Sequence, residues 1–314
     1  MPAERIAFST PLDKPRWQRW LLYSSGARIL WFMLLVAGIG LAVQSAFSVW
    51  GWRVEGPMAP PVALLTAQLL PALLAYLAIV FRLERRRAGE LAWRDLPSYG
   101  LGGLAAGLAL FSVVVLVLWL ADSYHVDGTR AQVDWLHGVV IVGFGAAVAE
   151  EILLRGVLYR MVEEGLGTWS ALLVSAAIFG ALHLGNPYAD PWSAIAIMIE
   201  AGILLALLYH VTRSLWACIG LHAGWNIAEG TVYGIPVSGS TAEGGWLDAS
   251  LSGPDWLTGG SFGAETSVVA VAVCLLPSIA LLAIAVRRGS LVSPSWRRRV
   301  ASPVQVPRSD SGAA

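Results

Sequence analysis

Six of the polar side chains that lie within apolar stretches, where such groups are costly, have the types and spacing for chemistry. They are Glu150, Glu151, Arg155, His183, His222 and Asn226. Ionisable residues inside a membrane span mark a functional site by default. Carboxylate, imidazole and carboxamide are also the groups that proton transfer and oxyanion stabilisation use. The set therefore predicts a polar site within the membrane.

The segment AVAEEILLR places the first three of these groups on one helix. Glu151 and Arg155 are four residues apart, so they share a face and can form a buried ion pair. Glu150 points about 100° away around the helix and cannot use Arg155 in the same way. Two interpretations follow. Either Glu151 and Arg155 brace the helix while Glu150 faces a cavity, or all three form one structural ion network.

Each of the two histidines lies one helical turn from a second notable residue. Phe179 precedes His183 by four residues, and His222 precedes Asn226 by four. An imidazole and a carboxamide one turn apart can both donate to a single oxygen, as a developing oxyanion requires. The alternatives are that His183 is a hydrogen-bonded packing residue and that Asn226 joins neighbouring helices. Glu200 and Glu229 also lie in these apolar stretches.

Glu150, His183 and His222 together offer two chemistries. One carboxylate and two imidazoles could hold a divalent metal such as zinc, with an open position for water. Without a metal, Glu150 would act as the general base, oriented by His183, and take a proton from water. His222 and Asn226 would then hold the tetrahedral oxyanion. Both versions predict hydrolysis of a carbonyl bond inside the membrane, and no GxSxG or HExxH motif competes with them.

The elements that must position these residues are predicted to be membrane-spanning helices. The 314 residues are 56% hydrophobic and 13% charged, their formal net charge is zero and their mean hydropathy is +0.64. A soluble domain is typically about 25% charged, and a nucleic-acid-binding protein carries a basic excess. The composition therefore predicts an all-α polytopic membrane bundle in the cell membrane. Its partner is the lipid bilayer, with no nucleic acid.

About eight apolar stretches have the roughly 20 residues that a membrane span needs. They run approximately over 27–50, 61–81, 101–120, 136–159, 169–183, 192–211, 216–235 and 268–286. Outside these stretches nearly all Lys and Arg residues fall in alternate segments, and only Arg53 and Arg130 fall in the others. Because Lys and Arg accumulate in cytoplasmic loops, we expect both termini in the cytoplasm.

This pattern predicts the following organisation. The parts are a cytoplasmic N-terminal segment (1–26), three scaffold helices (27–135), the catalytic core of helices four to seven (136–235), an extracytoplasmic Gly/Ser-rich loop (236–267), the eighth helix (268–286) and a basic disordered tail (287–314).

Three motifs in this order resemble the CPBP family of intramembrane proteases, also called the Abi or CAAX-protease family, which includes the type II CAAX prenyl endopeptidases. The motifs are Glu-Glu-x-x-x-Arg at 150, 151 and 155, Phe-x-x-x-His at 179 and 183, and His-x-x-x-Asn at 222 and 226. The similarity covers roughly residues 139–235, and all motif positions match.

The resemblance implies an eight-helix endopeptidase with a conical cavity open toward the cytoplasm and the membrane. On the family pattern, Glu150 and His183 activate water, and His222 and Asn226 stabilise the oxyanion. The supporting residues would be Glu151, Arg155 and Phe179. The implied substrate is a membrane-associated protein or peptide. The metalloprotease mechanism and the glutamate-dependent, metal-free mechanism both stay open.

Two other functions are compatible with the same residues. A non-catalytic membrane immunity or scaffold protein could use the same fold. A transporter or proton relay could also use intramembrane Glu and His residues. A relay predicts ionisable residues along a path that involves both halves of the chain, and their confinement to the stretches between 136 and 235 disfavours it.

Overall fold

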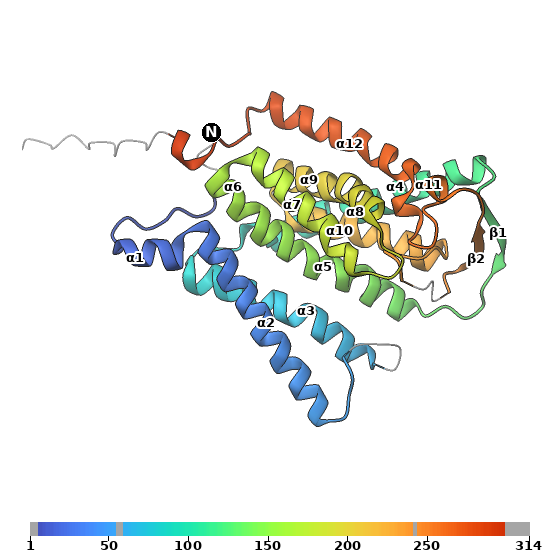
Figure 1. Ribbon diagram of the computed structural model, residues 1–314, viewed down its shortest axis with the longest axis horizontal. Helices are drawn as coiled ribbons and strands as arrows, with labels where there is room; N and C mark the ends of the chain where they lie inside the picture. The colour runs from blue at the N-terminus through green and yellow to red at the C-terminus, as the bar shows by residue number, and fades with distance from the viewer. Residues whose placement is uncertain (1–5, 55–58, 241–243, 299–314) are drawn as a thin grey trace, which may run out of the picture.

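The computed structural model describes residues 6–54, 59–240 and 244–298 of the chain, and these are mostly helical (Figure 1). Within these residues seven helices are long and apolar enough to cross a membrane. They are Ser25–Val49, Pro61–Leu83, Trp93–Leu120, Leu136–Leu166, Thr168–Gly185, Pro191–Thr212 and Val268–Arg287. The predicted all-α membrane bundle is confirmed, and the chain is a multi-pass membrane protein.

Several of these helices contain π-helical turns or end in 3₁₀ turns. In chain order the main helical elements are α2 (Ser25–Val49), α3 (Pro61–Leu77), η3 (Ala78–Leu83), η6 (Leu96–Gly100), α4 (Leu101–Leu120), η7 (Leu136–Gly145), α5 (Ala146–Glu151), η8 (Ile152–Tyr159), α6 (Arg160–Leu166), α7 (Thr168–Leu182), η9 (His183–Gly185), α8 (Pro191–Ile197), η10 (Met198–Ile203), α9 (Leu204–Thr212), α10 (Leu215–Asn226), η11 (Ile227–Val232) and α12 (Val268–Arg287). The shorter elements are α1 (Arg16–Gln18), η2 (Arg19–Tyr23), η4 (Gly89–Leu91), η5 (Trp93–Asp95), α11 (Asp255–Thr258), η12 (Ala264–Thr266) and η13 (Ser295–Arg297).

The seventh expected span, 216–235, is helical as α10 and η11, but it is not one of the seven helices above. Its polar residues, among them His222, Asn226 and Glu229, lower its hydropathy. It is nevertheless deeply placed, because every residue of α10 except Trp216 is buried. It packs against α4, α5, α9, η6 and η7. The bundle, rather than lipid, therefore surrounds its polar side chains.

Glycines allow α10 to approach α4 closely. A Cβ atom at Gly107 would lie 2.1 Å from the carbonyl oxygen of Leu221, and one at Gly224 would lie 2.3 Å from that of Leu104. Gly103 and Gly220 make equally close approaches to the opposite backbone. Small residues four apart are the usual means by which membrane helices bring their backbones together. This contact fixes the position of the helix that carries His222 and Asn226.

A small sheet lies at one end of the helices. β1 (Tyr124–Thr129) pairs antiparallel with β2 (Leu247–Leu251), and Tyr124 lies opposite Leu251. The Tyr124 hydroxyl donates to the Tyr233 carbonyl over 2.9 Å and ties the sheet to the end of η11. The predicted loop 236–267 therefore contains β2, α11 and η12, although residues 241–243 lie outside the described part of the chain.

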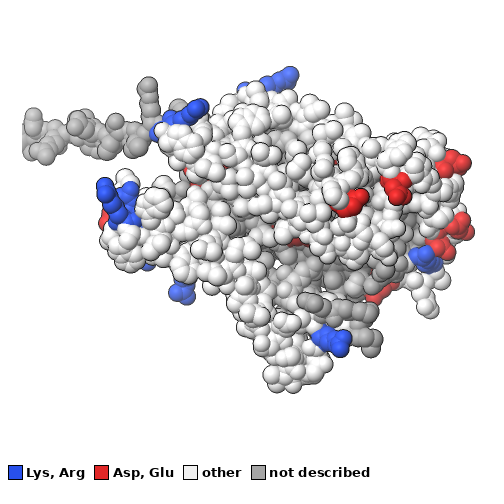
Figure 2. All heavy atoms as spheres, viewed as in Figure 1, with Lys and Arg blue, Asp and Glu red and all other residues white. Residues whose placement is uncertain are grey.

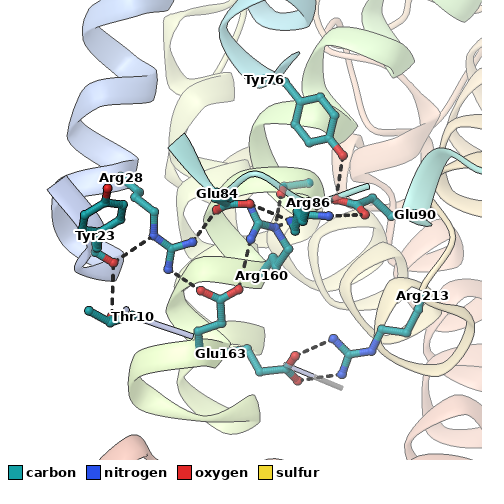
Figure 3. A network of polar contacts seen from close by, with 12 residues as sticks. Thr10, Tyr23, Arg28, Tyr76, Glu84, Arg86, Glu90, Arg160, Glu163 and Arg213 are labelled. Atoms are coloured by element: carbon teal, nitrogen blue, oxygen red, sulfur yellow. Dashed lines mark hydrogen bonds and ion pairs between the residues drawn. The ribbon is translucent and has the colours of Figure 1, made fainter. Parts of the chain in front are cut away.

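An ion cluster at the opposite end joins the first helices to the predicted catalytic core (Figure 3). Arg28 of α2 pairs with Glu84, which follows η3, and with Glu164 of α6. Arg160 contacts the same two carboxylates at 2.9 and 3.0 Å. Arg86 extends the cluster from Glu84 to Glu90. All side chains of this cluster are buried or nearly so, and each carboxylate has an arginine partner.

Part of the expected disordered tail packs against the bundle. The Val292 carbonyl accepts from the Thr168 amide over 2.9 Å, and the Val292 amide donates to the Thr168 hydroxyl over 2.8 Å. Arg298 donates to the Glu164 carbonyl. These contacts order residues at least as far as Arg298, and the rest of the expected tail, 299–314, lies outside the described residues.

The ion cluster predicts a pH dependence of stability. Burial raises the pKa of Glu84, but Arg160, Arg28 and Arg86 outweigh it and hold the pKa below its usual value. Since the folded-state pKa is lowered, this contribution is present above the unfolded pKa of about 4.3 and is lost as the pH falls below it. We expect the unfolding midpoint in detergent to change little between pH 8 and 5 through this cluster and to fall at lower pH.

Glu84→Gln tests the same cluster at neutral pH. Because it leaves buried arginines short of a counter-charge, we expect a loss of about 3–5 kcal/mol in stability, measured by thermal unfolding in detergent. Asp13→Asn is the control, since the side chain of Asp13 is 72% exposed in its pair with Lys14, and such pairs contribute about 0–1 kcal/mol. Equal unfolding midpoints for the two variants would contradict this role of the cluster.

The α4–α10 contact provides a second stability prediction. Gly107→Leu places a side chain where the backbone of α10 lies, so we expect the two helices to separate and the variant to unfold at a lower temperature than the wild type. Gly102→Leu on the same helix is the control, because a Cβ atom there meets nothing within 4 Å. If both variants unfolded like the wild type, the close helix contact would be wrong.

Candidate active site

Glu151 and Arg155 form the ion pair that their spacing predicts. Arg155 Nη1 lies 2.8 Å from Glu151 Oε1, and both side chains are fully buried. Arg155 Nη2 also donates to the Gly202 carbonyl over 3.0 Å, and the guanidinium lies 4.9 Å from the centre of the Phe179 ring. The pair therefore links the helix Leu136–Leu166 to η10 and α7.

Glu151 has a second partner on α10. His222 Nδ1 lies 3.0 Å from Glu151 Oε1. Because an ionised carboxylate only accepts, Nδ1 carries the hydrogen and donates it, which fixes the orientation of the imidazole ring. His222 Nε2 then faces the other way and lies 4.0 Å from Glu150 Oε2. The buried Glu151 carboxylate thus orients the His222 ring so that Nε2 faces Glu150.

Glu150 is placed very differently from Glu151, as their angular offset on the helix predicts. The Glu150 side chain is 34% exposed, whereas that of Glu151 is fully buried. The Oε2 atom of Glu150 is buried and has no hydrogen-bond partner. Its distance of 4.0 Å to His222 Nε2 is too long for a hydrogen bond, and a water molecule is the usual bridge across such a separation.

His183 lies at the end of α7, in the 3₁₀ turn η9. Its Nδ1 donates to the Phe179 carbonyl over 2.8 Å, so a neutral His183 has its lone pair on Nε2. The Phe179 ring is edge-on to His183 at 4.8 Å and edge-on to His222 at 5.9 Å between ring centres. Phe179 thus contacts both imidazoles and sets their spacing.

One small cavity joins four of the predicted residues, one of which is the supporting residue Phe179. His183, His222 and Asn226 line a space of about 20 Å³, which is room for about one water molecule. Asn226 Nδ2 donates to the Val142 carbonyl over 3.2 Å, and its second hydrogen remains for another acceptor. Glu150 is not among the residues that line this cavity.

The cavity also has lining residues that sequence reasoning did not place there, namely Glu200, Ser238 and Glu265. Burial raises the pKa of Glu265, and His183 and Ser238 act in the opposite direction. The Glu265 amide donates to Glu229 Oε1 over 3.3 Å, which holds η12 against η11. No spacing signal could have found Glu265, because it comes from a connection far along the chain from the three motifs.

Glu150, His183 and His222 are the residues that would hold a metal if the reaction uses one. The Glu150 and His222 donor atoms are 4.0 Å apart, and Glu150 is not among the residues that line the cavity with His183. Among the described residues no group of three or more His, Cys, Asp or Glu side chains is arranged to hold a metal ion. We therefore derive no catalytic step through a metal.

Comparison with known proteins identifies the class of this region. Residues 132–228 match the family model for type II CAAX prenyl endopeptidase Rce1-like proteins. The match contains all three motifs and confirms the resemblance to the CAAX-protease family. It ends before Ser238 and Glu265. The chain matches no curated protein.

The central ion pair has a testable effect on stability. Arg155→Met removes the cation but keeps most of the side-chain volume, so it leaves the buried Glu151 charge without an arginine partner. We expect a loss of about 3–5 kcal/mol, measured by thermal unfolding in detergent. Arg94→Met is the control, because the Arg94 side chain is 88% exposed. An Arg155→Met protein as stable as the control would show that the pair is not a brace.

Proposed function

We propose that the chain is an intramembrane endopeptidase that hydrolyses a peptide bond of a membrane-associated polypeptide. The observation that carries the proposal is the buried, unpartnered Oε2 atom of Glu150, which faces His222 Nε2 across 4.0 Å. A buried acceptor without a partner is costly, and a site that holds water or substrate relieves that cost. The family match over residues 132–228 supports the same class.

In the proposed reaction Glu150 is the general base. It takes a proton from water as the water oxygen attacks the carbonyl carbon of the peptide bond. His183 orients the water through the lone pair on Nε2. The resulting tetrahedral intermediate collapses, the carbon–nitrogen bond breaks, and the proton passes from Glu150 to the leaving amine. The products are a carboxyl group and an amine, so the step uses one water and no other reactant.

His222 and Asn226 are the proposed oxyanion donors. A protonated His222 presents Nε2–H on the side away from Glu151, and Glu151 supplies the negative charge that this cation requires. The free Nδ2 hydrogen of Asn226 is the second donor. Oxyanion donors of this kind act strongly because they are already oriented before the charge develops. Glu151, Arg155 and Phe179 position these donors and do not touch the substrate.

We extend the proposal to the organisation of the chain. Residues 136–235 would form the catalytic core, and the helices within 27–135 would form a scaffold in the cell membrane. The close packing of α4 on α10 and the Arg28–Glu164 contact support this division. The scaffold would keep the core aligned and would contribute no catalytic group.

Glu150→Gln tests the proposed base. Because the amide cannot accept the proton from water, we expect cleavage to be lost while the protein stays folded. Comparative membrane proteomics of cells with the wild type and the variant would detect the missing protein termini. Asp127→Asn, on exposed β1, is the matched carboxylate-to-amide control and should retain activity. Full biological activity of Glu150→Gln would instead favour the scaffold or immunity function.

Asn226→Ala tests the oxyanion donor. Loss of one such donor typically lowers kcat by about 10²–10³-fold, and we expect a decrease in that range with little change in KM. The rate would be followed on a substrate found by the terminus comparison. A change in KM alone would assign Asn226 to substrate binding and contradict the oxyanion role.

A further inference from the structure

Charged side chains are separated between the two ends of the bundle. Figure 2 shows most of the visible Lys and Arg at the end that carries α1, and most of the visible Asp and Glu at the end that carries β1 and β2. The first end includes the termini of η3, α6, α9 and α12, which the Arg28–Glu164 and Arg213–Glu163 pairs and the Thr168–Val292 contacts draw together. We call it the arginine-rich end and the other the acidic end.

The basic residues of the acidic end are few. Among the described residues of its connections they are Arg53 and Arg130, and Arg130 is paired with Asp248. Lys and Arg are retained on the cytoplasmic side of membrane proteins, whereas Asp and Glu have little effect on orientation. This asymmetry places the arginine-rich end in the cytoplasm and the acidic end outside it.

The candidate site lies toward the acidic end of the bundle. His183 lies in the turn that leaves α7 at that end, and Asn226 is one helical turn closer to it than His222. Ser238 and Glu265, which belong to the connections at the acidic end, line the same cavity. The Asn186 side chain donates to the Ser238 carbonyl over 3.0 Å and joins two of these connections beside the cavity.

The path toward the arginine-rich end is filled by the core. Cys218 lies one turn from His222 in that direction and is fully buried, as is Leu215 one turn further. Leu207 of α9 is 2% exposed and belongs to the same apolar cluster. None of the residues that line the cavity comes from a connection at the arginine-rich end. The polar lining residues that come from connections, Ser238 and Glu265, thus both belong to the acidic end.

We propose that the site is reached from the extracytoplasmic side, so that its substrates are membrane-anchored segments of exported polypeptides. The nature of the reaction rests on the proposed endopeptidase function. The side from which the site is reached rests only on the distribution of charge and on the residues that line the cavity. It reverses the cytoplasmic opening that the family resemblance implies. Cleavage would occur in the extracytoplasmic half of the bilayer, and cytoplasmic prenylated C-termini would not reach the site.

Single cysteines and a membrane-impermeant maleimide test the orientation on the full chain in intact cells. The native Cys218 and Cys274 are buried, so the wild type measures the background. Ser250→Cys reports the acidic end and Ser295→Cys the arginine-rich end, and both positions are exposed. We expect Ser250→Cys to react in intact cells and Ser295→Cys to react only after permeabilisation. The opposite result, or reaction of both in intact cells, would overturn the proposed orientation.

Two further variants test the opening of the site. Ser238→Cys lies in the wall of the cavity at a partly exposed position, and Tyr188→Cys lies on an exposed turn beyond His183. We expect both to react from the same side as Ser250→Cys. If Ser238→Cys folds, as judged by size exclusion in detergent, but reacts only after permeabilisation, the extracytoplasmic opening is wrong. If it does not fold, Tyr188→Cys decides the side of the His183 turn. None of these measurements requires cleavage, so their failure is distinguishable from a failure of the Glu150→Gln test.

Discussion

The arrangement of the site depends on one buried carboxylate. Glu151 accepts from Arg155 and from His222 at 2.8 and 3.0 Å through the same oxygen. In a medium of low dielectric constant a buried charge is tolerated only when it is paired and hydrogen-bonded. Arg155 and His222 are therefore held within hydrogen-bond distance of Glu151. The orientation of His222 and its approach to Glu150 follow from this requirement. Glu151 therefore positions the site without taking part in the proposed reaction.

The glycine contact between α4 and α10 explains how a helix with His, Asn and Glu residues occupies the middle of a membrane bundle. Lipid would leave these side chains without partners, at a cost of several kcal/mol each. Close backbone approach at Gly107 and Gly224 surrounds α10 with protein instead. The residues that make α10 less hydropathic than the other helices are the ones that the bundle buries. The polar residues of α10 therefore account both for its low hydropathy and for its place inside the bundle.

Periodicity and spacing predicted the helices and the Glu151–Arg155 pair, because both arise from contacts within one element. The three motifs also indicated His183, His222 and Asn226, which line one cavity. Contacts between distant segments were not predictable. The Arg28–Glu164 pair, the packing of Val292 on Thr168 and the placement of Glu265 in the cavity depend on how elements meet in space. The position of Glu150 outside the cavity lining depends on helix rotation, which spacing alone does not determine.

The buried carboxylates at the arginine-rich end and those around the candidate site differ in whether they have arginine partners. At the arginine-rich end Glu84, Glu90, Glu163 and Glu164 each have an arginine partner. Among the described residues around the site only Glu151 has one, and one oxygen each of Glu150, Glu151, Glu229 and Glu265 is buried without a partner. A carboxylate that already has an arginine partner has less need of another donor, whereas a buried carboxylate oxygen without a partner is costly. Among the described residues, the carboxylate oxygens without a partner lie around the site, and none belongs to Glu84, Glu90, Glu163 or Glu164. Water or substrate at the site would supply the missing donors. The same imbalance supports the proposal that the helices before residue 136 hold the core and contribute no catalytic group.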